Sequence, residues 1–436
     1  MNTEQIDKIK KLVLIDKRNV FFTGPAGTGK STLLKSLVQS LERTGRRVAV
    51  TASTGIAASH INGTTLHRFI GCGLATNPTD VMVKSILDRL TSRERWQAVE
   101  TLVVVEISMI NAELFDKVEE IARLVRDDKR PFGGIQLIVV GDFLQLPPVK
   151  GKACFLANTW CEVIDEIVHL DQVFRQTHPV FVAVLQRLRL GEATEKDHSW
   201  INKNLTRKIT PPKGVIPTYT VCTNDEADVF NTQFIQRLPK TTRVVYKSTD
   251  RFFTSEITVK DINCECTMRE ELELRLGAKV MLTYNYSDVL VNGSIGYVTE
   301  FMHEFVPARP VVKFECGLEM CVHPRKWYLH RLMDTHQLRT TVIEDEEEED
   351  RVTRRSQVIA SRRQIPLRLA WAITIHKSQG QTLEWHVALV NNIFAKGQLY
   401  TAMSRANDPD KLEVRGYTGK INKICQETND YYFGKR

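Results

Sequence analysis

The stretch VFFTGPAGTGKSTLLKSLVQSL, residues 20–41, decides the fold of the first part of this chain. It starts with an apolar run typical of a strand, continues as GPAGTGKS at Gly24–Ser31, and ends in a helical pattern from Thr32 that continues to Arg43 beyond the stretch. The middle segment fits the phosphate-loop pattern G-x-x-x-x-G-K-[ST] between a strand and a helix. Glycines let backbone N–H groups turn toward phosphates, and the positive end of the helix faces the anion. The stretch therefore predicts a nucleoside triphosphate site.

Two side chains of this loop have predicted roles of their own. Lys30 reaches the β- and γ-phosphates, and the Ser31 hydroxyl can hold Mg²⁺. The alternative is a glycine-rich turn without a ligand, which seldom occurs in this strand–loop–helix context. The nucleotide-binding residues predicted from the loop are Gly24, Pro25, Ala26, Gly27, Thr28, Gly29, Lys30, Ser31 and Thr32.

Length and composition indicate an intracellular protein of two or three domains. The chain has 436 residues, 42% of them hydrophobic, which is enough for several cores. The apolar runs are shorter than the roughly 18–20 residues that span a bilayer. The N-terminal segment MNTEQIDKIKKL lacks the apolar core of a signal peptide. Nine scattered cysteines without a C-x-x-C pair do not indicate a zinc site.

The net charge of +8 includes a run of seven carboxylates at Glu344–Asp350, so the rest of the chain is more basic still. A basic body of this kind indicates a polyanionic partner. The acidic run predicts a solvated, disordered loop. The alternative is an internal mimic that competes with nucleic acid for the basic surface.

Strand and helix patterns alternate along the first 170 residues and again after Asp171. Alternation predicts parallel sheets with helices on both faces and a ligand at the carboxyl ends of the strands. The predicted strands are Val20–Thr23, Val48–Thr51, Thr101–Val105, Ile135–Val140 and Thr218–Cys222, with helices at Glu113–Arg126 and Val180–Leu190. From Tyr284 the pattern changes to the short strands of a small β-barrel, Ile295–Phe301, Val311–Phe314 and Met320–His323. After Gln364 the α/β pattern resumes with Leu367–Ile375 and Val387–Val390.

Five further segments identify a family. They are TASTGIAA (51–58), GTTLHRF (63–69), PFGGIQLIVVGDFLQLPPV (131–149), HKSQGQTL (376–383) and GQLYTAMSRA (397–406). With the phosphate loop, they make the chain resemble the petite integration frequency (PIF) helicases, a 5′-to-3′ branch of helicase superfamily one. The resemblance runs in order from Gln5 to about Tyr432. The stretch Phe115–Val149 is similar to a signature that separates these proteins from RecD-like helicases.

The resemblance implies a fold and an activity. The fold is α/β, with two RecA-like domains and an inserted SH3-like β-barrel that opens at Leu290–Gly296. The implied domains are 1–170, with a small wedge region at 68–91; 171–283 with 363–436; and 284–362, with the acidic loop 344–350. The implied activity is ATP- and Mg²⁺-dependent unwinding, 5′ to 3′ along single-stranded DNA.

The same resemblance extends to partners and biological setting. The implied partners are single-stranded and forked DNA, G-quadruplexes and RNA–DNA hybrids. The implied roles are DNA replication, repair, recombination and telomere maintenance. We expect a monomer without a membrane segment, in the nucleus or cytoplasm of a host cell, or encoded by a virus.

Glu106 is the predicted catalytic carboxylate. It follows an apolar strand, where it can orient and deprotonate the attacking water and contact Mg²⁺ through water. The family reads Asp-Glu-Ile-Ser-Met here, whereas this chain has Val105 before Glu106. The missing Asp steadies the Mg²⁺ shell in the family. An alternative is therefore a hydrolysis-impaired, nucleotide-gated binder of single-stranded DNA. A P-loop kinase or transporter ATPase, a third alternative, leaves HKSQG unexplained.

Other residues take their roles from matching family motifs. Gln5 resembles a residue that selects adenine, and Gln145 resembles the γ-phosphate sensor. Arg175 and Arg405 are similar to two arginine fingers, whose guanidinium groups match phosphate oxygens. Gly380 lets the backbone approach the γ-phosphate.

The predicted DNA contacts also come from the motifs. Hydroxyl and histidine side chains suit the phosphate backbone and add affinity without reading sequence. Phe69 is the candidate for base stacking, with a core position as the alternative. His67 and His376 are not spaced as metal ligands. The predicted contacts are Thr51, Ser53, Thr54, His67, Phe69, His376, Lys377 and Ser378.

Overall fold

The computed structural model divides the chain into two compact units, residues 1–227 with 373–436, and residues 228–372. The described residues are 3–59, 61, 63–71, 75, 77–212, 215–255, 258–259, 262–263, 266, 268–284, 286–287, 289–290, 292–332, 338–342, 356–419 and 426–433. The acidic run predicted at 344–350 lies outside them. In the described part of the chain, no helix has the length and apolar character needed to cross a membrane.

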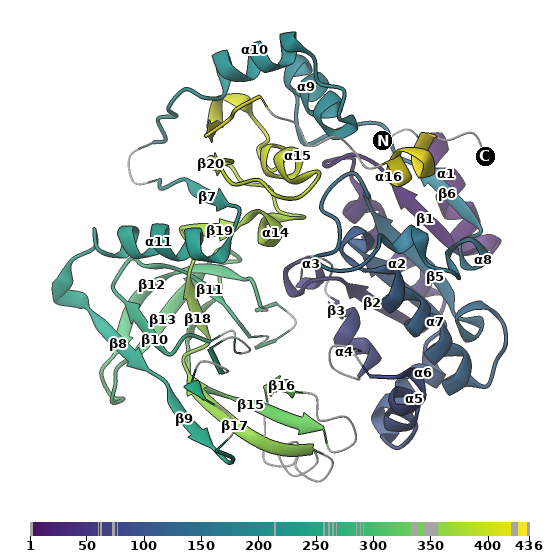
Figure 1. The fold of residues 1–436 in the computed structure, drawn as a ribbon, viewed down its shortest axis with the longest axis horizontal. Coiled ribbons are helices and arrows are strands. Elements are labelled where there is room, and N and C mark those ends of the chain that lie inside the picture. The colour runs from purple at the N-terminus through teal and green to yellow at the C-terminus, as the bar shows by residue number, and fades with distance from the viewer. Residues whose placement is uncertain are drawn as a thin grey trace. The chain divides into compact units, whose positions relative to one another are not determined.

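The first unit contains a six-stranded parallel sheet in the order β3-β2-β4-β5-β1-β6 (Figure 1). Its strands are β1 (Val20–Thr23), β2 (Val48–Ala52), β3 (Thr64–Thr65), β4 (Thr101–Val105), β5 (Gln136–Gly141) and β6 (Glu166–His169). Every residue of β1, β4 and β5 is buried. Strands covered on both faces need continuous apolar sequence, which is why these segments could be predicted.

Alternation along β1 sends neighbouring side chains to opposite faces of this sheet. Val20 and Phe22 join a core with the leucines of helix α2 (Lys30–Arg43), whereas Phe21 joins the core of helix α7 (Ala112–Arg126). The Asn111 side chain caps α7 by accepting a hydrogen bond from the Leu114 N–H at 2.8 Å. Both helices confirm the predicted pattern.

Short helices surround this sheet. They are α1 (Thr3–Lys10), α3 (Gly55–Ser59), α4 (Leu66–Ile70), α5 (Thr79–Leu87), α6 (Leu90–Ala98) and α8 (Trp160–Val163). The predicted wedge region 68–91 spans the end of α4, all of α5 and the start of α6. Here Phe69 packs on Trp96, with ring centroids 4.8 Å apart.

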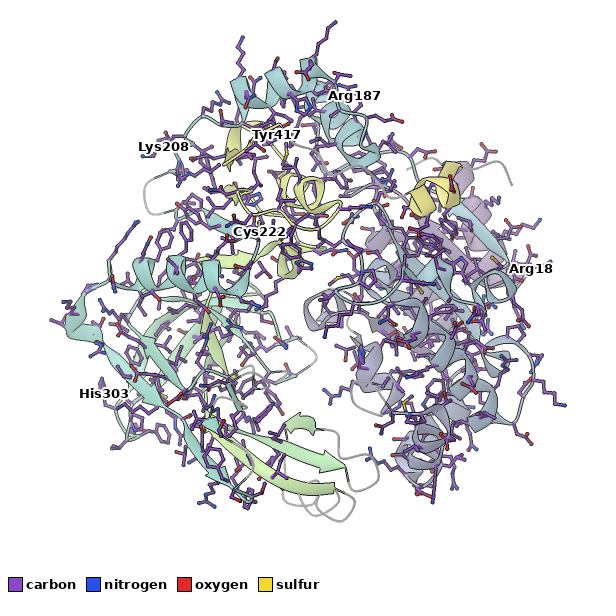
Figure 2. The ribbon with its side chains drawn as sticks, viewed as in Figure 1. Arg18, Arg187, Lys208, Cys222, His303 and Tyr417 are labelled. Atoms are coloured by element: carbon purple, nitrogen blue, oxygen red, sulfur yellow. The ribbon has the colours of Figure 1, made fainter. Side chains whose placement is uncertain are left out.

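A second sheet of the first unit has the order β19-β7-β20-β21. Its strands are β7 (Thr218–Val221), β19 (Ala372–Thr374), β20 (His386–Leu389) and β21 (Leu412–Arg415), and β20 runs parallel to β7 and β21. The segments that precede and connect these strands contain four helices. They are α9 (Pro179–Leu190), α10 (Glu195–Asn204), α14 (Ile375–Ser378) and α15 (Gln398–Met403). Arg187 of α9, labelled in Figure 2, donates to Asp197 of α10 at 2.7 and 2.5 Å.

The second unit is built from antiparallel sheets in the orders β14-β13-β12-β11-β18, β16-β15-β17-β9 and β10-β8. The strands are β8 (Val244–Lys247), β9 (Thr249–Phe252), β10 (Glu271–Leu274), β11 (Lys279–Leu282), β12 (Ile295–Met302), β13 (Arg309–Phe314), β14 (Glu319–Cys321), β15 (Arg325–Leu332), β16 (Leu338–Val342), β17 (Ser356–Gln364) and β18 (Leu367–Leu369). Helix α11 (Asn224–Ile235) leads into this unit. The short strands predicted between residues 295 and 323 are confirmed.

Two details of this unit differ from the sequence pattern. The run Leu367–Ile375 forms two strands in different sheets, β18 and β19, because the chain turns at Ala370 and Trp371. Strand β11 pairs with β12, so the boundary predicted at residue 284 falls within a sheet, and the unit starts at residue 228. The three-part division and the closed SH3-like barrel stay predictions.

Candidate nucleotide and nucleic-acid site

The phosphate loop connects β1 to α2 at the carboxyl end of the first sheet. Gly24, Gly27 and Gly29 have φ values of 153°, 83° and 81°. A Cβ on Gly24 would lie 2.2 Å from the Leu170 carbonyl oxygen, and one on Gly27 would lie 2.5 Å from the Arg175 Cβ. Only glycine, which has no Cβ, lets the loop backbone come this close to Leu170 and Arg175. The loop therefore packs against segments that lie far along the chain.

Lys30 is the charged group of this loop. Its ammonium donates to the carbonyl oxygens of Gly24 at 2.7 Å and Pro25 at 2.8 Å. Burial lowers the pKa of Lys30 to about 8, against the opposing attraction of Asp142 and Glu106. An approaching phosphate favours the charged ammonium over the neutral amine, so this lysine suits a phosphate ligand.

Glu106 follows β4 in a left-handed conformation, with φ 56° and ψ 47°. Its Oε2 accepts a hydrogen bond from the Gln379 Nε2 at 2.9 Å. A Cβ on Gly380 would lie 3.6 Å from the Glu106 Oε1, so the Gly380 backbone lies against the carboxylate. Strain of this kind in a non-glycine residue is typical of functional sites. Gln379 was not among the predicted residues, since its role depends on facing a carboxylate 273 residues away.

Asp142 organises the turn after β5. It accepts two hydrogen bonds from the Arg189 guanidinium, both at 2.8 Å, and one from the Gln145 Nε2 at 3.3 Å. Burial opposes its charge, but Arg189 outweighs burial and keeps the pKa of Asp142 below its ordinary value. Asp142 and Arg189 were both missed by the sequence analysis. Asp142 thereby orients Gln145, the predicted γ-phosphate sensor.

The two predicted arginine fingers lie close to the loop. The Phe174 N–H donates to the Gly27 carbonyl at 2.8 Å, which places Arg175 on the loop, and the Arg175 Nη1 donates to the Ser404 carbonyl at 2.9 Å. Arg405 is 1% exposed, and its Nη2 lies 3.5 Å from the Gln145 Oε1. Burial, together with the nearby positive charge of Arg175, lowers the pKa of Arg405 to about 9.

The donors present fit Mg²⁺ bound to a nucleotide. In the described part of the chain, no group of three His, Cys, Asp or Glu side chains could hold a metal alone. Ser31 is exposed in the first turn of α2, and Glu106 supplies a half-buried carboxylate. Mg²⁺ keeps several waters and prefers phosphates with one or two protein oxygens, which is what these residues offer.

Gln5 lies outside this cluster of contacts. Its Nε2 donates to the Asp171 carboxylate at 2.9 Å. Asp171 precedes the segment that carries Arg175, so the hydrogen bond ties helix α1 to that segment. The adenine-selecting role stays a prediction.

The predicted DNA contacts separate into two groups. The structure buries the side chains of Thr51, Phe69 and Ser378. The Thr51 hydroxyl donates to the Val103 carbonyl at 2.6 Å and the Ser378 hydroxyl to the Ile375 carbonyl at 2.8 Å. Their hydroxyls therefore support the local backbone, and Phe69 takes the core position that was its alternative.

The remaining five predicted DNA residues are half-buried: Ser53, Thr54, His67, His376 and Lys377. The Ser53 hydroxyl is buried and has no hydrogen-bond partner among the described residues. Burial lowers the pKa of His67 and of His376, so both imidazoles are neutral at pH 7 and offer hydrogen bonds rather than charge. The His376 ring stacks on Phe394, with centroids 6.0 Å apart.

A parallel sheet with a phosphate loop, and a second sheet whose flanking segments carry Arg175 and Arg405, define a P-loop nucleoside triphosphatase with two RecA-like cores. Comparisons with known proteins agree. The family described as "PIF1-like helicase" matches residues 1–199, and "DNA helicase Pif1, 2B domain" matches residues 259–301.

Relatives extend these matches over the whole chain. ATP-dependent DNA helicase PIF1 of Xenopus laevis is 37% identical over 426 residues, covering 96% of this chain and 62% of the relative. ATP-dependent DNA helicase RRM3 of Saccharomyces cerevisiae is 31% identical, covering 99% and 67%. The chain thus spans about 62% of the length of several PIF1 relatives.

Two solved structures support the same family. The crystal structure of Pif1 helicase from Candida albicans has a TM-score of 0.87 and 34% identity, over 98% of this chain and 97% of that one. The Bacteroides Pif1 structure with ADP-AlF3 and single-stranded DNA has a TM-score of 0.79 and 28% identity, over 99% and 96%. This chain belongs to the PIF1-like helicase family, as its motifs indicated.

Proposed function

We propose that this chain is an ATP-dependent DNA helicase that moves 5′ to 3′ along single-stranded DNA. The observation that carries the proposal is that groups from both sheets of the first unit meet beside the phosphate loop. Gln379 contacts Glu106 at 2.9 Å, and Arg405 approaches Gln145 at 3.5 Å. Tyr400 adds a third link by accepting a hydrogen bond from the Ala26 N–H at 2.8 Å.

These contacts suggest how hydrolysis is coupled to movement. Lys30, Arg175 and Arg405 supply positive charge where a triphosphate gains negative charge in the transition state. Glu106 accepts a proton from water that Gln145 orients, since Arg405 lies near both side chains. Mg²⁺, held by Ser31 and the phosphates and contacted by Glu106 through water, would neutralise phosphate charge. Because the arginines come from the second RecA-like core, hydrolysis loosens the contact between the two cores.

DNA binding is the other half of the proposal. Ser53, Thr54, His67, His376 and Lys377 are the half-buried members of the predicted contact set. Their hydroxyl, imidazole and ammonium groups match a phosphate backbone. Bacteroides Pif1 has been solved with single-stranded DNA. Forks, G-quadruplexes and RNA–DNA hybrids as substrates, a monomeric state and a nuclear or cytoplasmic location belong to the same proposal.

The test is ATP hydrolysis and unwinding of Lys30→Ala beside the unchanged protein. We expect single-stranded DNA to stimulate hydrolysis by the unchanged protein, and a 5′-tailed duplex to be unwound in preference to a 3′-tailed one. Lys30→Ala should abolish both activities and keep DNA binding, whereas Lys35→Ala, on the exposed side of α2, should keep all three. Unwinding by Lys30→Ala would overturn the mechanism.

A second candidate, a nucleotide-gated DNA binder with little turnover, is favoured by Val105. This side chain is 6% exposed and lies in register with Val140 of β5, in the core under the loop. It supplies no oxygen where the family has Asp. If Val105 limits turnover, Val105→Asp should raise the hydrolysis rate strongly. Val105→Asn should not, because asparagine has nearly the shape of aspartate but lacks its charge. Rapid hydrolysis by the unchanged protein would exclude this candidate.

A further inference from the structure

Helix α16 (Gln426–Phe433) packs on the first sheet, although the sequence assigned residues 363–436 to the second RecA-like domain. Tyr431 and Tyr432 join the core that contains Phe143, Phe155 and Trp160. The Phe143 ring meets Tyr431 edge-on at 5.7 Å and Tyr432 at 6.4 Å. The helix is therefore held by aromatic contacts at the end of the sheet that carries the phosphate loop.

The Tyr432 hydroxyl contacts two strand ends at once. It lies 2.8 Å from the Thr23 hydroxyl and accepts a hydrogen bond from the Phe143 N–H at 3.1 Å. Thr23 is the last residue of β1, directly before Gly24, and Phe143 directly follows Asp142. Because β1 and β5 are neighbours, with Thr23 opposite Gly141, one hydroxyl fixes the exit of both strands.

The Tyr432 ring adds a third contact. The Arg189 guanidinium lies 5.9 Å from the ring centroid while it holds Asp142. Arg189 comes from α9, so Tyr432 lies where the loop, the Asp142 turn and α9 meet. Burial raises the pKa of Tyr432, which keeps the hydroxyl protonated and able to donate.

We propose that Tyr432 is a positioning residue of the nucleotide site, and that α16 acts through it to set the phosphate loop relative to the Asp142–Gln145 turn. This inference rests on the proposed function, since it assumes that the loop binds a nucleotide. Thr23 is 0% exposed. When the Tyr432 hydroxyl is removed, the Thr23 hydroxyl loses this hydrogen bond and cannot replace it with one to water. The loop would then relax from the geometry that accepts phosphates.

The test compares Tyr432→Phe with Tyr431→Phe. Both changes remove one hydroxyl from the same helix, but the Tyr431 hydroxyl accepts from the indole N–H of Trp160 in α8 at 3.1 Å, whereas the Tyr432 hydroxyl contacts the ends of β1 and β5. We expect Tyr432→Phe to raise the Kd for a fluorescent ADP analogue, and the KM for ATP, by roughly tenfold. Tyr431→Phe should leave both unchanged, while the two variants lose similar amounts of Tm.

Equal nucleotide affinity of the two variants would overturn the inference. Thr23→Val approaches the same hydrogen bond from its other side, and combined with Tyr432→Phe it should weaken binding no further than either change alone. Additive effects would also overturn the inference. Failure of the unchanged protein to bind the analogue would instead overturn the proposed function.

Discussion

Two buried arginines, one in each compact unit, show how differently the same side chain can be accommodated. Arg362 of the second unit is 0% exposed, and Arg405 of the first unit is 1% exposed. Arg362 donates to the Asp250 carboxylate at 2.8 and 2.6 Å and to the Asn263 amide oxygen at 2.7 Å. The described acceptors of Arg405 are uncharged oxygens, among them the Thr401 carbonyl at 2.9 Å and the Ser404 hydroxyl at 2.9 Å.

The pKa shifts of the two arginines differ in sign. Asp250 outweighs burial and raises the pKa of Arg362, whereas burial lowers the pKa of Arg405 to about 9. A buried cation that pairs with its own carboxylate, as Arg362 does with Asp250, has its charge neutralised within the protein and has a structural role. A buried cation whose hydrogen-bond acceptors are neutral is stabilised when an anion arrives, which supports the predicted role of Arg405 as an arginine finger. The comparison gives three predictions.

The largest expected effect is on catalysis. Arg405→Met should lower kcat for ATP by about 10³-fold or more, because an arginine finger neutralises transition-state charge. Its free energy of unfolding, measured in urea without nucleotide, should be unchanged or higher, because an uncompensated buried charge is removed. Arg405→Lys keeps the charge without the fork and should recover little activity. A large loss of stability would contradict the comparison.

The next effect is on stability. Arg362→Met should lower the free energy of unfolding by about 3–5 kcal/mol, because Asp250 is left without its partner. Nucleotide affinity should not change. Arg363→Met, at the exposed neighbouring position, is the control and should cost far less. Adding Asp250→Leu to Arg362→Met should restore part of the loss, and the absence of any recovery would show that Arg362 stabilises by packing alone.

The smallest effect is a pH dependence of nucleotide binding. Lys30 has its pKa lowered to about 8, so it is charged below that pH and neutral above it. Binding of a phosphate requires the charged form, so affinity should be constant below about pH 8 and then fall about tenfold per pH unit. Isothermal titration calorimetry should detect proton uptake above that pH. Lys30→Arg, which stays charged, should remove the pH dependence even where it weakens binding.

The predictable parts of the fold were those with local signals. The strands β1, β4 and β5 are continuous apolar runs buried on both faces, and the phosphate loop combines a fixed spacing with glycines that no other residue can replace. The pattern of Leu367–Ile375 did not predict that this segment divides into two strands of different sheets, because a short apolar run carries no signal for such a division. Thr51 and Ser378 match the family motifs, but the motifs do not reveal whether their side chains are exposed. A hydroxyl can donate a hydrogen bond to a backbone carbonyl as readily as to a ligand.

The sequence by itself determined the phosphate loop, the parallel sheet around it, the short strands after residue 295 and the family. It also placed Lys30, Glu106, Gln145 and the two arginines in order along the chain. Only the tertiary structure decided which distant residues contact each other in the site. Gln379 donates to Glu106, Arg189 donates to Asp142, and the Tyr432 hydroxyl pairs with Thr23, 409 residues away. Backbone conformation follows from neighbours in sequence, whereas the partner of a buried polar group is set by packing between distant segments.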